Sequence, residues 1–192
     1  MRTKSLLTIA LAAAGMLYGA SVYAVDPPTT GPFGTGKITF TGTITNSPCD
    51  IAPGDDAITV PLGQISYRHL KAADDVSDSK PFTIHLQNCA FDANDTVIAG
   101  SAGKMSKVTV SFTGNADANN KGYVNTGNAQ DVAVQLLKSD NHSILTPNTD
   151  ADVQQLQTGN NELNFFARVV ALGASVTPGT VESTVTYTLK YQ

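Results

Sequence analysis

The sequence lacks the features that mark nucleic-acid-binding proteins and proteins that span a membrane. Only 15% of its 192 residues are charged, with 12 lysines and arginines against 16 aspartates and glutamates. No stripe of basic residues is present, which argues against nucleic acid as a partner. After residue 20 there is no long apolar run, so the rest of the chain holds no candidate for a bilayer-spanning helix.

Sequence motifs of catalysis are also missing. The chain has no nucleophile elbow, no phosphate-binding loop and no HExxH sequence. Its three histidines are scattered, and His85 occupies an outward position in a strand pattern. The loop carboxylates are interpreted as solvated groups rather than catalytic pairs: Asp55, Asp56, Asp74 and Asp75. The sequence therefore predicts no enzyme, no cofactor, no metal site and no small-molecule substrate.

The first 24 residues have the three-part layout of a secretory signal peptide. Arg2 and Lys4 precede the apolar run 6–20, and "SVYA" places modest side chains before a cut after Ala24. A transmembrane anchor is the alternative, but the run is short for a bilayer of about 30 Å. Removing this leader leaves 10 basic against 16 acidic residues, a net charge of −6. We expect an exported chain of about residues 25–192, which suits one domain with its own core.

The chain has two cysteines, Cys49 and Cys89. An exported chain meets an oxidising compartment, so we expect them to form a disulfide. The closed loop of about 40 residues corresponds to roughly 4 kcal/mol of stabilisation in the chain-entropy estimate. A redox or metal role is the alternative, and it is disfavoured because no histidine pattern accompanies the cysteines.

Alternation of apolar and polar residues with a period of two recurs along the chain and predicts β-strands. The expected strands are 36–45, 57–60, 82–88, 107–113, 132–138, 164–171 and 181–191. Segments rich in Gly, Asn and Asp separate them. Sustained helical periodicity is absent, and one short helical turn is expected around 68–75. Many short strands with turns between them indicate an all-β fold, and we favour a sandwich over a barrel.

The two outermost expected strands raise the question of what covers their apolar faces. In 36–45 one face carries Ile38, Phe40, Gly42 and Ile44. In 181–191 one face carries Val181, Val185, Tyr187, Leu189 and Tyr191. A long apolar strand at a sheet edge is a template for another chain. By pattern alone, we favour a position for the final strand in the middle of a sheet, between two earlier strands.

Five stretches of the sequence, which follow one another in the order typical of the family, resemble subunits of chaperone–usher pili. They are most similar to type 1 fimbrial major subunits. They are a leader, then "GKITFTGTITNSPC" (36–49), "VPLGQIS" (60–66), "FTIHLQNC" (82–89) and "FFARVVALGASVTPGTVESTVTYTLKYQ" (165–192). In the last stretch Gly179 is fourteenth from the end and Tyr191 is penultimate, which is the most specific of these signals. The resemblance covers nearly the whole chain after the leader.

The resemblance implies an incomplete immunoglobulin-like sandwich that lacks its last strand, with residues 46–192 as the pilin domain. Residues 25–45 would be an N-terminal extension whose Ile38, Phe40, Gly42 and Ile44 act as the donor strand of a neighbouring copy. The acceptor groove and chaperone-binding edge would comprise Gly179, Val181, Val185, Tyr187, Leu189 and Tyr191. The implied partners are other copies of the chain, a periplasmic pilus chaperone and an outer-membrane usher. The implied location is the cell surface, as part of a fimbria.

Alternatives remain at three levels. Gly42 can be read as a bulge glycine, and Tyr191 as an ordinary core aromatic. A minor adaptor or terminator pilin would share every motif quoted above. A secreted carbohydrate-binding module is a further alternative, although an adhesin would need an additional lectin domain and would lack a donor extension.

Overall fold

The protein is described from a computed structural model that covers residues 34, 36–91 and 105–192. The expected signal peptide falls outside these residues, as do residues 25–33 and 35 of the expected extension. The chain divides between Thr43 and Ile44 into two units, and the second unit, Ile44–Gln192, holds all the described strands. None of the helices in the described ranges has the length and apolar character that a bilayer span requires.

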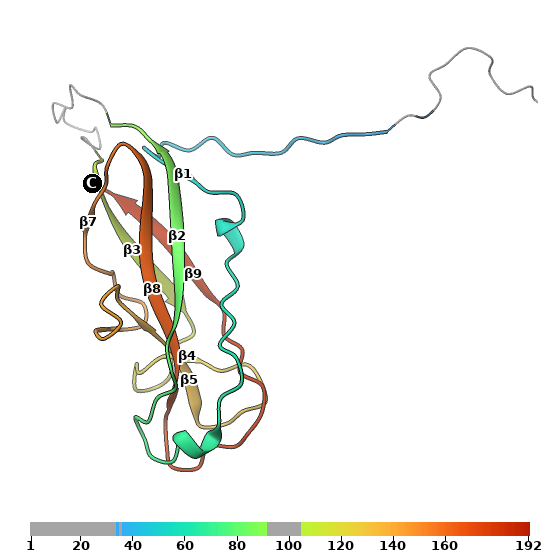
Figure 1. Ribbon diagram of the computed structural model, residues 1–192, viewed down its shortest axis with the longest axis vertical. Coiled ribbons are helices and arrows are strands. Elements are labelled where there is room, and N and C mark those ends of the chain that lie inside the picture. The colour runs from blue at the N-terminus through green and yellow to red at the C-terminus, as the bar shows by residue number, and fades with distance from the viewer. Residues whose placement is uncertain (1–33, 35, 92–104) are drawn as a thin grey trace, which may run out of the picture. The chain divides into compact units, whose positions relative to one another are not determined.

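The larger sheet is antiparallel and is organised around one long central strand (Figure 1). That strand, β8 (Gly159–Ala171), pairs with β2 (Lys80–Cys89) through its first part and with β5 (Val132–Leu137) through its second part. The remaining strands are two residues long: β1 (Asp50–Ile51) on β2, and β4 (Tyr123–Val124) and β6 (Ile144–Leu145) on β5. Two single-turn 3-10 helices, η1 (Asp55–Ala57) and η2 (Tyr67–His69), complete the first part of the unit.

The smaller sheet has three antiparallel strands in the order β7–β3–β9. The central strand β3 (Lys107–Gly114) pairs along its whole length with β9 (Val185–Tyr191), from Val108 opposite Tyr191 to Gly114 opposite Val185. On its other side β3 meets the two-residue strand β7 (Gln154–Gln155). One edge of this sheet is therefore short, and the other is a seven-residue strand.

The core lies between the two sheets. Phe112 of β3 packs edge-on against Phe165 of β8, with ring centroids 5.0 Å apart, and Phe82 of β2 lies 6.0 Å from Phe112. Val110 and Ile84, which face each other's sheets from β3 and β2, are fully buried. These contacts confirm the predicted all-β sandwich, because side chains from both inner faces share one apolar cluster.

The expected disulfide joins Cys49 and Cys89, and both residues are buried. Cys49 directly precedes β1 and Cys89 ends β2, so the bond fastens the start of the sandwich to an interior strand. Asn161 of β8 donates a hydrogen bond to the sulfur of Cys89 at 3.3 Å. The predicted pairing of the two cysteines is thus confirmed.

Most predicted strands match observed ones, with three corrections: those at 57–60 and 181–191, which follow, and that at 36–45, which is described with the candidate site. The prediction of a strand at 57–60 is wrong: η1 ends at Ala57, and Ile58 and Val60 after it are half-buried but join no sheet. The strand expected at 181–191 begins only at Val185, because residues 180–182 bond to a loop at 125–130 instead. The expected helical turn at 68–75 is the 3-10 turn η2, shorter and placed one residue earlier.

Candidate functional site

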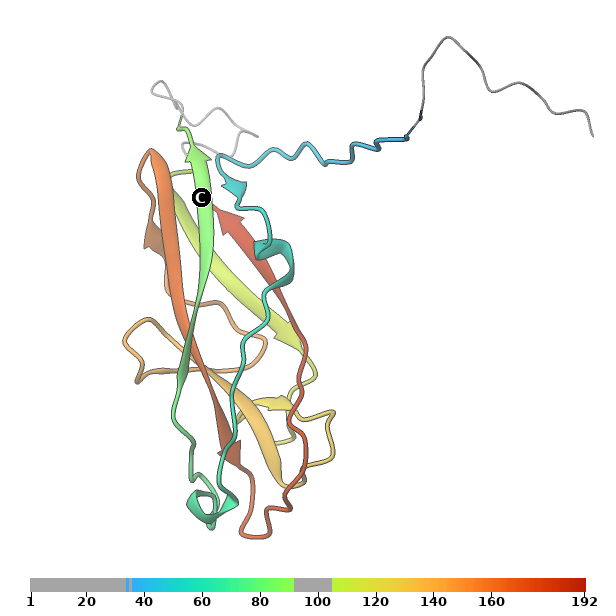
Figure 2. The ribbon, with the colours of Figure 1, turned by 45° about the vertical axis from the view of Figure 1, so that its right-hand side comes forward.

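The candidate site is the outer edge of β9, where the smaller sheet stops. Among the described residues β9 has β3 as its one strand neighbour, and its other side joins no ladder. Figure 2 shows β9 as the red arrow at this edge. Backbone donors and acceptors along such an edge can pair with an added strand. Within the part of the chain that the structure describes, the final strand is thus the edge of its sheet, not the mid-sheet strand that the pattern alone favours.

A row of apolar side chains on β9 faces the core without being covered by it. Val185, Tyr187, Leu189 and Tyr191 are half-buried, whereas Val108 and Val110 of the neighbouring β3 are fully buried. The alternate residues of β9 are exposed. The inner face of β9 thus lacks part of the covering that the same face of β3 receives.

The segment after η1 supplies further apolar side chains next to this core. Ile58, Val60 and Leu62 alternate along the chain, are half-buried and pack against the same cluster as the β9 row. No backbone hydrogen bond joins residues 58–66 to β9 within the described ranges. This pair of chain segments therefore contributes to one core without forming one sheet.

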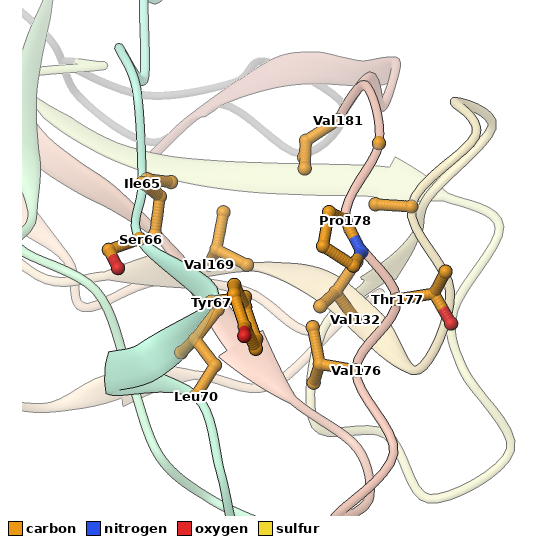
Figure 3. A pocket seen from close by; sticks show the side chains of 12 residues that line it. Ile65, Ser66, Tyr67, Leu70, Val132, Val169, Val176, Thr177, Pro178 and Val181 are labelled. Carbon is orange, nitrogen blue, oxygen red and sulfur yellow. The ribbon is translucent and has the colours of Figure 1, made fainter.

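A cavity of about 200 Å³ lies near the residues that lead into β9 (Figure 3). In Figure 3, Ile65, Tyr67 and Leu70 lie on one side, and Val176, Pro178 and Val181 on the other. Val132 and Val169 come from the larger sheet. Most of the lining side chains are apolar, with Ser66 and Thr177 as the polar exceptions, so the cavity can accept an aliphatic side chain.

The loop 125–130 holds this end of the site in place. The side-chain amide of Asn125 donates to the carbonyls of Ala129 and Thr180, and its oxygen accepts the N–H groups of Gly127 and Glu182 at 3.0 and 2.7 Å. Four backbone hydrogen bonds join the loop to the segment before β9: Thr126 donates to Glu182, Ala129 donates to Thr180, and Gln130 and Thr177 donate to each other. The segment that carries Val181 is consequently fixed by the loop and not by a β-ladder.

Gly179 has a specific packing role in this network. A Cβ at residue 179 would lie 2.5 Å from the carbonyl carbon of Asn128 and 2.8 Å from the Cα of Ala129. Because these are backbone atoms, any larger side chain would push the loop away. Gly179 also lines the cavity, so the structure places this sequence-predicted residue at the site and gives it a backbone-packing function.

Two tyrosine hydroxyls lie along the β9 row. Tyr187 donates its O–H to the carbonyl of Asp55 at 2.8 Å, and burial, with the nearby carboxylates of Asp55 and Asp56, raises its pKa. Burial likewise raises the pKa of Tyr191, and the nearby Ser47 side chain partly opposes this; the Tyr191 hydroxyl is buried, and no described residue meets the geometry of a hydrogen bond to it. Both groups therefore stay protonated at physiological pH.

The expected donor residues have almost no cover of their own. Ile38, Phe40 and Ile44 are 78%, 89% and 101% exposed, and no atom lies within 4 Å of a Cβ built on Gly42. Residues 36–45 belong to no strand, unlike the prediction, because a strand needs a ladder partner and the described chain provides none for them. Three large apolar side chains at alternate positions thus face solvent.

Sequence reasoning missed several parts of the site. The sequence pattern assigns none of three segments to the site: the residues after η1, the loop at 125–130 and the cavity residues 65–70. It also indicates a solvated carboxylate at Asp55. That interpretation is wrong: the Asp55 side chain is only 16% exposed and contacts His85. The alternation of Ile58, Val60 and Leu62 was a signal for a buried face, but nothing local in the sequence indicates which core it joins.

Known proteins resemble this chain over most of its length. A family model described as "Fimbrial protein" matches residues 38–192. The uncharacterized fimbrial-like protein YgiL of Escherichia coli strain K12 is 33% identical, over 98% of this chain and 97% of that protein. The type-1 fimbrial protein A chain of Escherichia coli is 30% identical over the full length of both.

A solved structure agrees with this relationship. A subunit from the structure of a chaperone–usher pilus, determined to explain rod uncoiling, superimposes with a TM-score of 0.68 and 28% identity. The match covers 85% of this chain and 99% of that subunit. The fold is accordingly the immunoglobulin-like sandwich of pilins. The chain belongs to the fimbrial protein family, and it is a structural subunit of a fimbria on the bacterial surface.

Proposed function

We propose that copies of this chain polymerise by donor-strand exchange, in which residues 36–45 of one copy add a strand to the β9 edge of the next. The observation that carries the proposal is a match of two surfaces. One is a strand edge with a half-covered apolar row, and the other is a segment whose exposed apolar residues alternate with polar ones. An added strand would bond the free backbone groups of β9 and cover its row.

The energetics support such an exchange. Full burial of Ile38, Phe40 and Ile44 corresponds to roughly 5–9 kcal/mol as an upper bound, at about 1.5–3 kcal/mol each. Each backbone hydrogen bond adds only about 0.5–1.5 kcal/mol net, but it removes an unpaired polar group from the edge. Gly42 shares the apolar face of the segment and would permit close approach to the groove backbone.

The direction of the added strand follows from the sheet it joins. β9 is antiparallel to β3, and antiparallel pairs predominate in sandwiches of this kind. Antiparallel addition would bring Ile44 toward the start of β9, on the side of the cavity, and Ile38 toward Tyr191. An isoleucine side chain matches the apolar lining of that cavity.

Before assembly, the same edge would be covered by a strand of a periplasmic pilus chaperone, and an outer-membrane usher would mediate the exchange. The solved relative comes from a chaperone–usher pilus, which supports this route. Tyr191 and the terminal carboxylate would contact the chaperone through charge-assisted bonds. Residues 1–24 would be removed on export, residues 25–45 would form the extension, and the chain would act structurally and not as an enzyme.

The test compares Phe40→Asp with Thr41→Asp in bacteria that export the chain. Each change adds one negative charge, but only the first alters the apolar face of the segment. On denaturing gels of unboiled samples, the parent and Thr41→Asp are expected to give a ladder that collapses on boiling, and Phe40→Asp a monomer. If Phe40→Asp forms the same ladder, residues 36–45 are not the donor and the proposal fails.

A further inference from the structure

The contacts of Asp55 connect both sheets at the candidate groove. Residues 50–52 run beside β2, with Ile51 opposite Leu86 and the N–H of Ala52 donating to the carbonyl of His85 at 2.9 Å. After Ala52 the chain leaves this ladder through Gly54, whose φ of 94° is in the left-handed region. The main chain then provides no acceptor for the N–H of His85.

The carboxylate of Asp55 takes that place. Its Oδ2 accepts the backbone N–H of His85 at 2.5 Å and lies 2.8 Å from Nδ1 of the same residue. A side chain thus substitutes for a main-chain carbonyl at the edge of β2. This lets the chain turn away from the larger sheet without leaving the His85 amide unpaired, which would be costly.

The main chain of Asp55 points to the other sheet. Its carbonyl accepts the hydroxyl of Tyr187, in the middle of β9, at 2.8 Å. One residue is therefore bonded to β2 of the larger sheet through its side chain and to β9 of the smaller sheet through its backbone. The next residue, Asp56, is exposed to solvent, which makes it a matched control.

We infer that Asp55 is a positioning residue for donor-strand binding: it holds η1 and the Tyr187 ring at the separation that an incoming strand requires. This inference rests on the proposed function. Without the carboxylate, the segment from Pro53 to Ala57 loses its attachment to β2. Tyr187 of the half-covered row on β9 stays bonded to the Asp55 carbonyl, so the released segment can settle onto that row. A groove closed in this way must reopen before a donor binds. The apparent affinity for the donor then falls in proportion to the fraction of molecules whose groove is open.

The experiment measures binding of a fluorescein-labelled peptide with the sequence of residues 36–45. The acceptor is the exported chain carrying Phe40→Asp, which removes its own donor activity and leaves the groove intact. In this background Asp55→Ala is expected to weaken peptide binding by about tenfold or more, mainly through slower association. Asp55→Asn keeps an oxygen acceptor for the His85 amide and should bind the peptide as the parent does. Asp56→Asn should leave binding unchanged.

Two further readouts separate positioning from general stability. Binding is compared at a temperature where circular dichroism shows every variant folded, so a purely structural role for Asp55 predicts unchanged affinity there. Tyr187→Phe removes the other bond and should weaken binding about threefold, less than additively with Asp55→Ala. If Asp55→Ala does not fold, peptide binding by Tyr187→Phe alone tests the inference.

The outcomes separate the role of Asp55 from donor-strand exchange itself. A parent that fails to bind the peptide overturns donor-strand exchange itself. A parent that binds, with folded Asp55→Ala or Tyr187→Phe binding equally well, overturns the role of Asp55 and leaves the proposed function standing. Rescue by Asp55→Asn together with loss in Asp55→Ala supports the inference.

Discussion

Gly179→Ala is expected to destabilise the subunit itself, through backbone contact and not through loss of any side chain. The added Cβ would lie 2.5 Å from the carbonyl carbon of Asn128, whereas carbon atoms rest about 3.5–4.0 Å apart. The loop and the segment before β9 must therefore separate by about 1 Å. That separation acts directly on the hydrogen bonds between them.

The size of the effect follows from those bonds. Ala129 donates to Thr180 at 3.0 Å and Gln130 donates to Thr177 at 3.2 Å, so an added ångström takes both beyond bonding range. Two lost bonds, with their partners partly desolvated, correspond to about 2–4 kcal/mol. For a domain of this size the unfolding temperature should fall by roughly 5–15 °C. The cavity wall formed by Pro178 and Val181 should shift as well.

The assay is thermal unfolding followed by circular dichroism, on the exported chain with Phe40→Asp so that polymerisation does not contribute. Gly173→Ala is the matched control, because a Cβ there would meet its nearest atom, Oδ2 of Asp131, at an ordinary 3.6 Å. The control should unfold within about 2 °C of the parent. If Gly179→Ala unfolds at the same temperature as Gly173→Ala, the close approach does not constrain the site and the reasoning is refuted.

Three further predictions concern other parts of the molecule. Gly42→Leu should abolish fibres in electron micrographs while leaving the unfolding temperature of the subunit unchanged, because a Cβ at Gly42 meets no atom of its own chain; normal fibres would contradict the donor assignment. Cys49→Ser opens the disulfide to Cys89, which closes a sequence separation of 40 residues, and should lower the free energy of unfolding by about 4 kcal/mol. The amount of the Cys49→Ser variant in the periplasm, measured on immunoblots, should fall. An unchanged amount together with an unchanged urea midpoint would contradict the stabilising role of the disulfide. Asn125→Ala removes four hydrogen bonds of one side chain and should cost about 2–4 kcal/mol in urea unfolding, with an effect below about 0.5 kcal/mol refuting the role given to the loop.

Much of the sandwich could be predicted from local alternation, because its inner faces are regular. Residues 107–113 read as a strand with Val108, Val110 and Phe112 on one face, and the observed β3 extends this by one residue with all three buried. The cysteine pairing also followed from export chemistry alone. Such features depend on residue alternation or on the cellular compartment. A single sequence indicates both, the second through its signal peptide.

The rest of the site depends on tertiary contacts that a local pattern does not contain. Ile58 and Val60 alternate as a strand does and are half-buried, yet they have no ladder, since pairing is decided by what lies alongside. The late start of β9 arises from bonds between residues 180–182 and a loop more than 50 positions earlier. The pairing of Asp55 with His85, 30 residues apart, is equally invisible to periodicity, which explains why a structural carboxylate looked like a solvated one.

The unequal edges of the smaller sheet set the geometry of any assembly that extends it. One edge is the two-residue polar strand Gln154–Gln155, and the other is the seven-residue strand β9. A contact between an extension and the long edge joins two different surfaces, so it is heterologous and does not close into a symmetric pair. Where successive copies do not close into a ring, growth by this contact gives a fibre with a polarity, and the copy at one end has a β9 that no sibling has reached. A different molecule would be needed to cover the β9 edge at that end.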